Sequence, residues 1–282
     1  MKRFFLYAVA LLATSAGFVS CAEDKVEPNP VLTADVESFT LTGLNETLSV
    51  TLTAPGVYEV VAPEWITVNT PAARATNATA VIKLTAHVND SGAERAGEIV
   101  FKSAGLTYAI PVTQAATPAG KYVYNITSAY GDTYTDTLVV EWSGVDPTVF
   151  NVGNIDPFFA SVGAKYNAGC NYAEATFETE DGMLYIEPMT EIHMGGVQIG
   201  DYLLQGAEIY TFGLTESFEE AMGNLQNALN YGVLYSEDGY QTLTMPGAFV
   251  SIFYSEQTPN GSYFDAFNGN VTYTRVTEEV AE

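Results

Sequence analysis

Alternation of apolar and polar residues is the dominant pattern between residues 31 and 116. In Thr47–Thr53, Leu48, Val50 and Leu52 fall on one face of an extended chain and hydroxyl residues fall on the other, which predicts a strand buried on one side. We predict further strands at residues 57–61, 65–68, 80–86, 97–101 and 108–114. About seven short strands in about 90 residues favour an Ig-like β-sandwich, which we assign to residues 31–116.

Residues 121–282 continue the β pattern with a different composition. Thr117-Pro118-Ala119-Gly120 supplies a linker between them and the sandwich, and 15 of the 18 tyrosines follow residue 120. Turn-forming residues recur between apolar runs at 180–182, 237–239 and 260–261. Each of these turns predicts an antiparallel hairpin, so we expect a larger antiparallel sheet or barrel over residues 121–282.

One segment of this second domain has a helical pattern. Ser217-Phe218-Glu219-Glu220 is a capping box, in which serine and glutamate side chains satisfy free backbone N–H groups. Apolar residues then recur at helical spacing at positions 218, 221, 222, 225 and 229. We therefore predict one amphipathic helix near residues 217–231, packed on or inside the sheet or barrel. The predicted fold class is all-β with this one helix.

The N-terminus has the pattern of an export signal. Two basic residues precede an apolar stretch at Phe4–Leu12, which is too short to span a bilayer. Small residues lead from it to Cys21, and Gly17–Cys21 resembles a bacterial lipobox. The resemblance implies a signal peptide at residues 1–20, an acylated Cys21 and a stiff tether at residues 21–30. The acidic residues after the cysteine are similar to the signal that directs Bacteroidota lipoproteins to the outer face of the outer membrane.

An excess of acidic residues excludes one class of partner. The chain has a formal net charge of −24, and residues 120–282 contain 23 acidic but three basic residues. Such a surface repels the phosphate backbone of nucleic acids. With 47% hydrophobic residues, the chain is globular. The partners that we expect are a membrane through the lipid anchor, a glycan or mucin, or another outer-membrane protein.

A second resemblance lies within the predicted sandwich. Residues 63–68 read Pro-Glu-Trp-Ile-Thr-Val, residues 94–99 read Glu-Arg-Ala-Gly-Glu-Ile, and residues 110–114 read Ile-Pro-Val-Thr-Gln. In this order they resemble a BACON domain, a family common in Bacteroidota surface lipoproteins and carbohydrate-active enzymes. The resemblance implies a β-sandwich that either binds glycan or mucin or serves as a spacer. Residues 121–282 are similar in general pattern to the calycin-like modules of Bacteroidota lipoproteins.

The sequence contains no familiar catalytic or metal-binding motif. It has no Gly-x-Ser-x-Gly, glycine-rich phosphate loop, His-Glu-x-x-His or calcium-loop pattern. Histidine occurs twice, and Cys170 has no cysteine partner once Cys21 carries lipid. We therefore predict a non-enzymatic protein with no cofactor and no metal. A hydrolase that uses two of the many carboxylates is the enzymatic alternative.

Glycan binding requires exposed aromatic rings beside hydrogen-bonding groups. The strongest candidate is Asn260–Asn268, where Tyr263, Phe264 and Phe267 lie beside Asp265 among turn-forming residues. We expect a loop there whose rings stack on sugars, with rings that cap the core as the structural alternative. The favoured function is contact with glycans or mucin in polysaccharide use by a lipoprotein of the outer-membrane surface. The main alternative is a structural or assembly partner of another outer-membrane protein.

Replacing Cys21 with serine should abolish acylation and release the mature protein from the membrane. Residues 22–282 contain no apolar run long enough to anchor it, whereas acyl chains contribute roughly 0.8 kcal/mol per buried CH2 group. Membrane fractionation in high salt measures the release, with the unchanged chain as control. A Cys21→Ser protein that still sediments with membranes would contradict the prediction.

Overall fold

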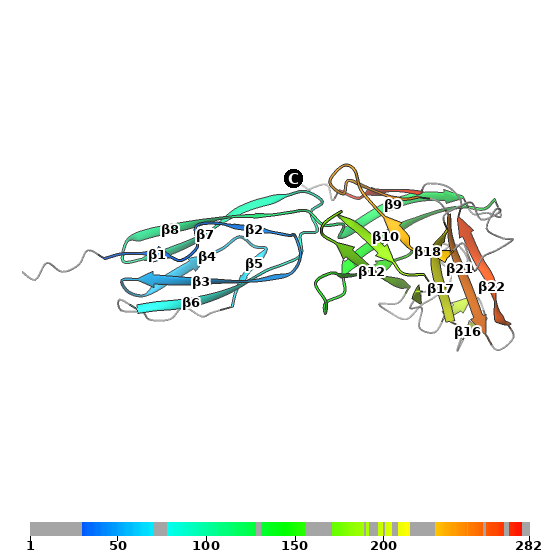
Figure 1. Ribbon diagram of the computed structural model, residues 1–282, viewed down its shortest axis with the longest axis horizontal. Coiled ribbons are helices and arrows are strands. Elements are labelled where there is room, and N and C mark those ends of the chain that lie inside the picture. Colours follow the sequence, from blue (N-terminus) through cyan, green and yellow to red (C-terminus); the bar gives the residue numbers. More distant parts are fainter. Residues whose placement is uncertain are drawn as a thin grey trace, which may run out of the picture. The chain divides into compact units, whose positions relative to one another are not determined.

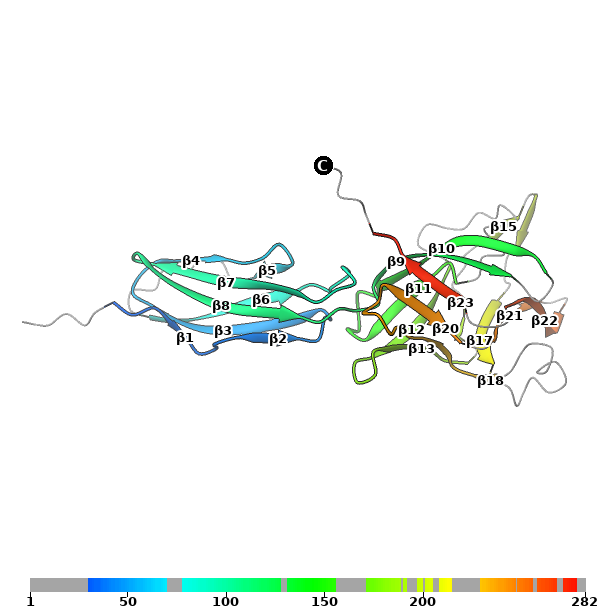
Figure 2. The ribbon, with the colours of Figure 1, turned by 90° about the horizontal axis from the view of Figure 1, so that it is seen from above.

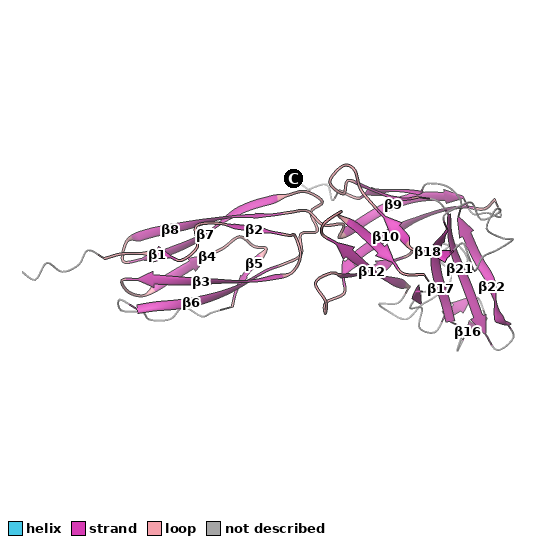
Figure 3. Ribbon diagram, viewed as in Figure 1, coloured by secondary structure: helices cyan, strands magenta, loops and turns pink. Residues whose placement is uncertain are grey.

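The computed structural model contains strands, turns and loops, and no helix, in the part of the chain that it describes (Figure 3). The described ranges are residues 30–69, 78–127, 131–155, 171–188, 190–191, 197–199, 201–204, 208–214, 229–246, 248–255, 258–267 and 271–277. Residues 32–282 form one compact unit. Among the described residues, no helix is long and apolar enough to cross a membrane. The prediction of a mainly β protein is confirmed for these ranges.

Eight strands form a sandwich of two four-stranded sheets (Figure 1). The order of one sheet is β1 (Thr33–Ala34), β3 (Glu46–Ala54), β6 (Ala78–Ala86) and β5 (Ile66–Val68), and that of the other is β2 (Phe39–Leu41), β8 (Leu106–Gln114), β7 (Arg95–Ser103) and β4 (Tyr58–Val61). Neighbouring strands are antiparallel, except that β2 runs parallel to β8. The six predicted strands are confirmed to within two residues at each end, whereas the short β1 and β2 were not predicted.

The alternating pattern determines which side chains enter the sandwich core. In β3, Leu48, Val50 and Leu52 are buried and the intervening residues are more exposed, as predicted. They belong to one buried cluster that also contains Ile99 and Phe101 of the other sheet. Burying one such side chain contributes about 1.5–3 kcal/mol. A shift of one residue in register would expose the whole set, so this burial specifies the register of β3.

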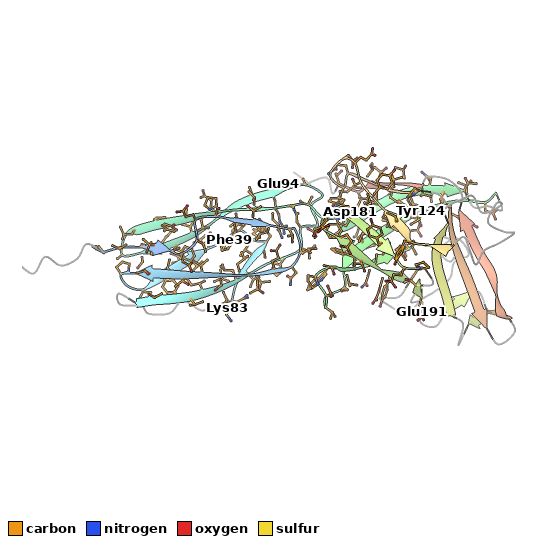
Figure 4. The ribbon with its side chains drawn as sticks, in the orientation of Figure 1. Phe39, Lys83, Glu94, Tyr124, Asp181 and Glu191 are labelled. Atoms are coloured by element: carbon orange, nitrogen blue, oxygen red, sulfur yellow. The ribbon has the colours of Figure 1, made fainter. Side chains whose placement is uncertain are left out.

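Eight further strands form a nearly closed antiparallel barrel (Figure 2). Their order is β19 (Gly232–Leu234), β13 (Met183–Ile186), β12 (Tyr172–Glu178), β11 (Val149–Gly153), β10 (Thr133–Trp142), β9 (Gly120–Thr127), β23 (Val271–Arg275) and β20 (Thr242–Met245). An isolated bridge between Tyr235, which follows β19, and Thr244 of β20 joins the two edges. Aromatic rings help to fill the interior, where Tyr124 and Tyr273 meet edge to face with centroids 4.9 Å apart (Tyr124 is labelled in Figure 4).

The remaining strands form two smaller sheets. One contains β14 (Thr190–Glu191), β17 (Glu208–Leu214), β18 (Leu229–Asn230), β21 (Ala248–Ser255) and β22 (Thr258–Phe267), and the other contains β15 (Val197–Ile199) and β16 (Tyr202–Leu204). Two predicted chain reversals are confirmed, at 180–182 between β12 and β13 and at 237–239 between β19 and β20. The turn predicted at 260–261 is wrong, because both residues lie inside β22.

Most of the helix predicted near residues 217–231 lies outside the described residues, which exclude 215–228. Its C-terminal end is wrong, because Leu229 and Asn230 form β18 and pair with Leu214 and Gly213 of β17. A single apolar residue at the end of a repeat fits a helix or a strand equally well. The edge of β17 supplies the backbone partners that decide between them.

A buried asparagine holds the loop that follows β6. The side-chain amide of Asn89 donates to the carbonyls of Ala93 at 2.8 Å and Ala115 at 2.9 Å, and the residue is fully buried. Its backbone N–H donates to the carbonyl of Gly43 at 2.8 Å, and its Oδ1 accepts from Ser91 Oγ at 2.7 Å. The asparagine therefore ties its own loop to the segments that follow β2 and β8.

Several residues that carry the BACON resemblance contact one another. The guanidinium of Arg95 lies over the ring of Trp65, 4.6 Å from its centroid, and donates to Gln114 Oε1 at 2.8 Å. Gly97 permits this packing, because a Cβ there would lie 2.6 Å from Cγ of Pro63. These contacts join the segment before β5 to the start of β7 and the end of β8. They hold the end of the sandwich from which the chain continues toward β9.

The segment predicted as a linker is buried and hydrogen-bonded. Thr117, Pro118 and Ala119 are all shielded from solvent, and Thr117 Oγ1 donates to the carbonyl of Asn89 at 2.7 Å. The hydroxyl of Tyr122 donates to the carbonyl of Pro118 at 2.8 Å. The chain therefore passes from β8 to β9 in a defined conformation, while the domain boundaries themselves stay predictions.

Replacing Asn89 with alanine should lower the free energy of unfolding by about 2–3 kcal/mol, because the carbonyls of Ala93 and Ala115 and the buried carbonyl of Gln114 lose their donor. Asn69→Ala is the matched control. Asn69 is exposed and donates to Thr85 Oγ1 at 2.6 Å, so its loss should cost about 1 kcal/mol or less. Urea denaturation of both variants measures the difference, and equal losses would show that Asn89 has no special role in stability.

Candidate functional site

A groove of about 820 Å³ lies beside the start of β9. Five segments of the compact unit contribute to it: the loop before β3, the loop after β6, the start of β9, the end of β10 and the end of β23 with the residues that follow. The lining residues are Asn45, His87, Val88, Asp90, Ser91, Ala119, Gly120, Lys121, Val139, Val140, Glu141, Trp142, Arg275, Val276 and Thr277. Small-ligand sites have volumes of about 300–1,000 Å³, so the groove is large enough to hold one.

The barrel contributes an indole ring and two opposite charges to the groove. Trp142 ends β10 and packs against the barrel core, and its Nε1 donates to the carbonyl of Asp146 at 2.7 Å, which orients the ring. Lys121 of β9 pairs with Val139 of β10. Both Lys121 and Glu141 are exposed, because odd-numbered residues of these two strands face away from the barrel interior.

Arg275 joins the walls of the groove. Its guanidinium donates to the carbonyls of Tyr240 at 2.7 Å, Asp90 at 2.9 Å and Ala119 at 2.9 Å, and to the hydroxyl of Tyr122. It also lies over the Tyr122 ring, 4.7 Å from the centroid. Burial raises the pKa of Tyr122, although the positive charge of Arg275 opposes the shift. The hydroxyl therefore stays protonated at neutral pH and remains a donor.

Two glycines leave room for this guanidinium. Gly92 and Gly120 have φ angles of +73° and +148°, and a Cβ at either position would overlap Arg275. Gln241 Nε2 also donates to the carbonyl of Gly92 at 2.9 Å. These φ angles lie in a region that favours glycine, so the backbone approaches the arginine closely on two sides.

The lining of the groove combines hydrogen-bond donors and acceptors with one aromatic side chain. Lys121 supplies an ammonium group, and Asp90 and Glu141 supply carboxylates. The His87 ring already bonds Thr67 Oγ1 at 2.7 Å. A sugar hydroxyl both donates and accepts hydrogen bonds, and the apolar face of a sugar packs on an aromatic ring. A neutral saccharide therefore matches this mixed lining better than a simple anion does.

An acidic side chain with an unpaired oxygen lies inside the barrel. Asp136 shares a face of β10 with the buried Leu138 and Val140. Its Oδ1 accepts from the N–H of Thr137 at 2.7 Å, but its buried Oδ2 has no hydrogen-bond partner among the described residues. Burial raises the pKa of this carboxyl above its ordinary value of 3.8. The ionised form is therefore unfavourable in the folded protein.

The four predicted glycan-binding residues lie together in one strand. Tyr263, Phe264, Asp265 and Phe267 belong to β22, so the loop predicted there is wrong. Tyr263 and Asp265 pair with consecutive residues of β21, which leaves Phe264 as the extra residue of a β-bulge. Pairing with β21 outweighs the turn-forming character of the surrounding residues. The side chains lie outside the described residues, so a role in glycan binding stays a prediction.

Sequence reasoning did not identify the groove. Lys121 and Glu141 lie in ordinary alternating strands, and the fold brings them to the loop that contains Asp90. Cys21 lies outside the described residues, so its acylation also stays a prediction. In the described ranges, no three His, Cys, Asp or Glu side chains are grouped so that they could hold a metal ion. For the rest of the chain, the absence of a metal is an expectation only.

The comparisons with known proteins identify one domain. Residues 57–115 match the BACON family model, described as "Putative binding domain, N-terminal", which confirms that resemblance for this part of the chain. No curated protein matches the chain. Among solved structures, it is similar to a Bacteroides ovatus GH5 xyloglucanase in complex with a XXXG heptasaccharide, with a TM-score of 0.28 and 12% identity. That match covers 32% of this chain and 20% of the xyloglucanase chain.

Replacing Asp136 with asparagine should stabilise the protein at pH 7. Because the folded state raises the pKa of Asp136, its ionisation opposes folding as pH rises above the unfolded pKa. The gain from Asp136→Asn should therefore disappear as pH falls below the ordinary value of 3.8, where both states are protonated. Melting temperatures of both proteins measured between about pH 3 and about pH 7 test this, because that range spans the ordinary pKa values of carboxyl groups.

Asp146→Asn is a control that should change the melting temperature in the opposite direction. Hydrogen bonds from the N–H and hydroxyl of Thr148 lower the pKa of Asp146, so its ionised form favours folding above the unfolded pKa. Its replacement should lower the melting temperature at neutral pH, and this loss should fade as pH falls through the lowered pKa. If Asp136→Asn lowered the melting temperature at neutral pH as Asp146→Asn is expected to do, the assignment of Asp136 would be wrong.

Proposed function

We propose that this protein is an acylated lipoprotein of the outer-membrane surface that contacts glycans or mucin without catalysing a reaction. The observation that supports glycan contact is the groove, whose lining includes Lys121, Glu141 and the oriented indole of Trp142. The ligand class is a neutral oligosaccharide. Its hydroxyl groups match neighbouring donors and acceptors, and a sugar face matches the ring.

The lipid anchor and the location on the outer-membrane surface are part of the same proposal. They rest on the lipobox-like segment that ends at Cys21 and on the acidic residues that follow it. We also propose that the barrel is a calycin-like module of Bacteroidota lipoproteins. Its eight antiparallel strands pair largely with their neighbours in the chain, from β9 through β13, which is the arrangement of small up-and-down barrels.

Glycan binding by the mature chain should be weak, with dissociation constants between about micromolar and millimolar, because one aromatic ring contributes about 0.5–1.5 kcal/mol beyond area burial. A Lys121→Ala, Glu141→Ala double variant should bind at least about tenfold more weakly. Both side chains are exposed, so the melting temperature should barely change. A glycan array followed by calorimetric titration measures binding.

Two further variants make the assignment specific. Glu98→Ala, Lys102→Ala removes one exposed charge of each sign from β7 of the sandwich and should bind like the unchanged protein. Tyr263→Ala, Phe264→Ala tests the strand residues predicted from sequence. Loss in that variant alone would move the site to β22 and overturn the groove assignment. If the intact protein ignores a broad array at high concentration, glycan contact is wrong and the role as a protein partner replaces it.

A further inference from the structure

A second cavity, of about 340 Å³, lies on the outer wall of the barrel. Its described lining residues are Thr176 and Glu178 of β12, Tyr185 of β13, Glu187 and Tyr231. In β12 and β13 the inward-facing neighbours, Phe177 and Leu184 among them, are buried in the core. Thr176, Glu178 and Tyr185 therefore project outward from the sheet, and Glu187 and Tyr231 lie directly beside the ends of β13 and β19.

Two aromatic rings form adjacent walls of this cavity. The rings of Tyr185 and Tyr231 meet at 88° with centroids 6.2 Å apart. The hydroxyl of Tyr185 donates to Asp181 Oδ2 at 2.6 Å, which fixes the ring from the turn between β12 and β13 (Asp181 is labelled in Figure 4). The Tyr231 side chain is 48% exposed. A ligand can therefore reach the face of one ring while it touches the other.

All the charges on the described lining of the cavity have one sign. Glu178 and Glu187 supply carboxylates, and the described lining contains no lysine, arginine or histidine. The negative charge of Asp181 lies next to Tyr185, where its hydrogen bond is the main cause that raises the pKa of the Tyr185 hydroxyl. A tyrosine face attracts a cation through the ring quadrupole. The carboxylates add Coulomb attraction for the same ligand.

We propose that the Tyr185–Tyr231 cavity binds an organic ammonium ion. The ligand places its substituted nitrogen against the two rings and within reach of Glu178 and Glu187. This site is separate from the groove and differs in chemistry, because the groove has both charges and one indole. A cation gains Coulomb attraction from both carboxylates and from the tyrosine faces, whereas a neutral sugar gains no such attraction. The size of the cavity suits a small ligand group rather than an extended chain.

Choline and its uncharged isostere, in which carbon replaces the nitrogen, test the proposal with the mature full-length chain. The two probes have the same shape, so a difference in affinity reports the charge. We expect choline to bind with a millimolar dissociation constant and at least about tenfold more tightly than the isostere. Ligand NMR shifts during titration measure both, and added salt should weaken the binding of choline. Equal binding of the two probes, or no binding of choline, overturns the proposal.

Matched variants separate the aromatic and acidic contributions. Tyr231→Ala should weaken choline binding about tenfold, whereas Tyr231→Phe, which keeps the ring, should bind within about twofold of the unchanged protein. Glu178→Gln should weaken binding severalfold. Glu174→Gln, at another exposed glutamate on the same face of β12, should not. If Glu174→Gln and Glu178→Gln act alike, the attraction comes from the general negative charge of the protein, and the site is rejected.

A short peptide with one lysine identifies the source of the ammonium group. Tighter binding of this peptide than of choline assigns the cavity to a lysine side chain of a protein partner. Tighter binding of choline assigns it to a free small molecule. Either assignment also requires that Tyr231→Ala and Glu178→Gln weaken the binding of the ligand, as described above for choline. Peptide binding that is unchanged in these two variants would place the peptide elsewhere and would not support the cavity.

Discussion

The positions of the described segments around the groove depend on the hydrogen bonds of the Arg275 guanidinium. Arg275 is the only arginine after residue 95, in a region with 23 acidic residues between positions 120 and 282. Its hydrogen bonds nevertheless go to the carbonyls of Asp90, Ala119 and Tyr240 and to the hydroxyl of Tyr122. Carbonyl oxygens around this partly buried cation satisfy its donors at fixed positions. One side chain thereby joins four separate segments of the chain.

This use of the arginine explains why nearby backbone conformations are unusual. Gly92 and Gly120 have positive φ angles and allow the backbone to come close to the guanidinium. Thr117 and Asn89 complete the connection on the side of the sandwich through a 2.7 Å hydrogen bond. The loop, the connection into β9 and the end of β23 are therefore held by one set of contacts. The segments that form the groove are therefore held by contacts within the protein, and a preformed site of this kind lowers the entropy cost of binding the proposed ligand.

Sequence periodicity was informative where one strand face is buried. In β3 and its neighbours, a period of two predicted the strands and the inward residues, because burial decides the register. It failed at β22, where Asn260 and Gly261 favour a turn locally but lie within a strand, between Thr258 and Ser262, which both pair with β21. It also failed at Leu229, where strand pairing replaces the end of a predicted helix. In each case pairing with another strand outweighed a local preference, and the short pattern that was read did not contain that strand.

The same reasoning explains why neither cavity was visible in the sequence. The groove draws on five segments, and the tyrosine cavity joins residues 176–187 to residue 231 through the pairing of β13 with β19. Each lining residue is unremarkable in its own segment, and its chemistry appears only through its neighbours in space.

The residues that did stand out have a different role. Trp65 and Arg95 stack, Arg95 bonds Gln114, and Gly97 makes room for the neighbouring proline and tryptophan. These contacts occupy the polar and aromatic groups that a ligand would otherwise use. The motif that identifies the BACON domain therefore accounts for how one end of the sandwich is held together. Charged and polar side chains that remain exposed to solvent lie instead in the loop after β6 and on the outward faces of the barrel strands.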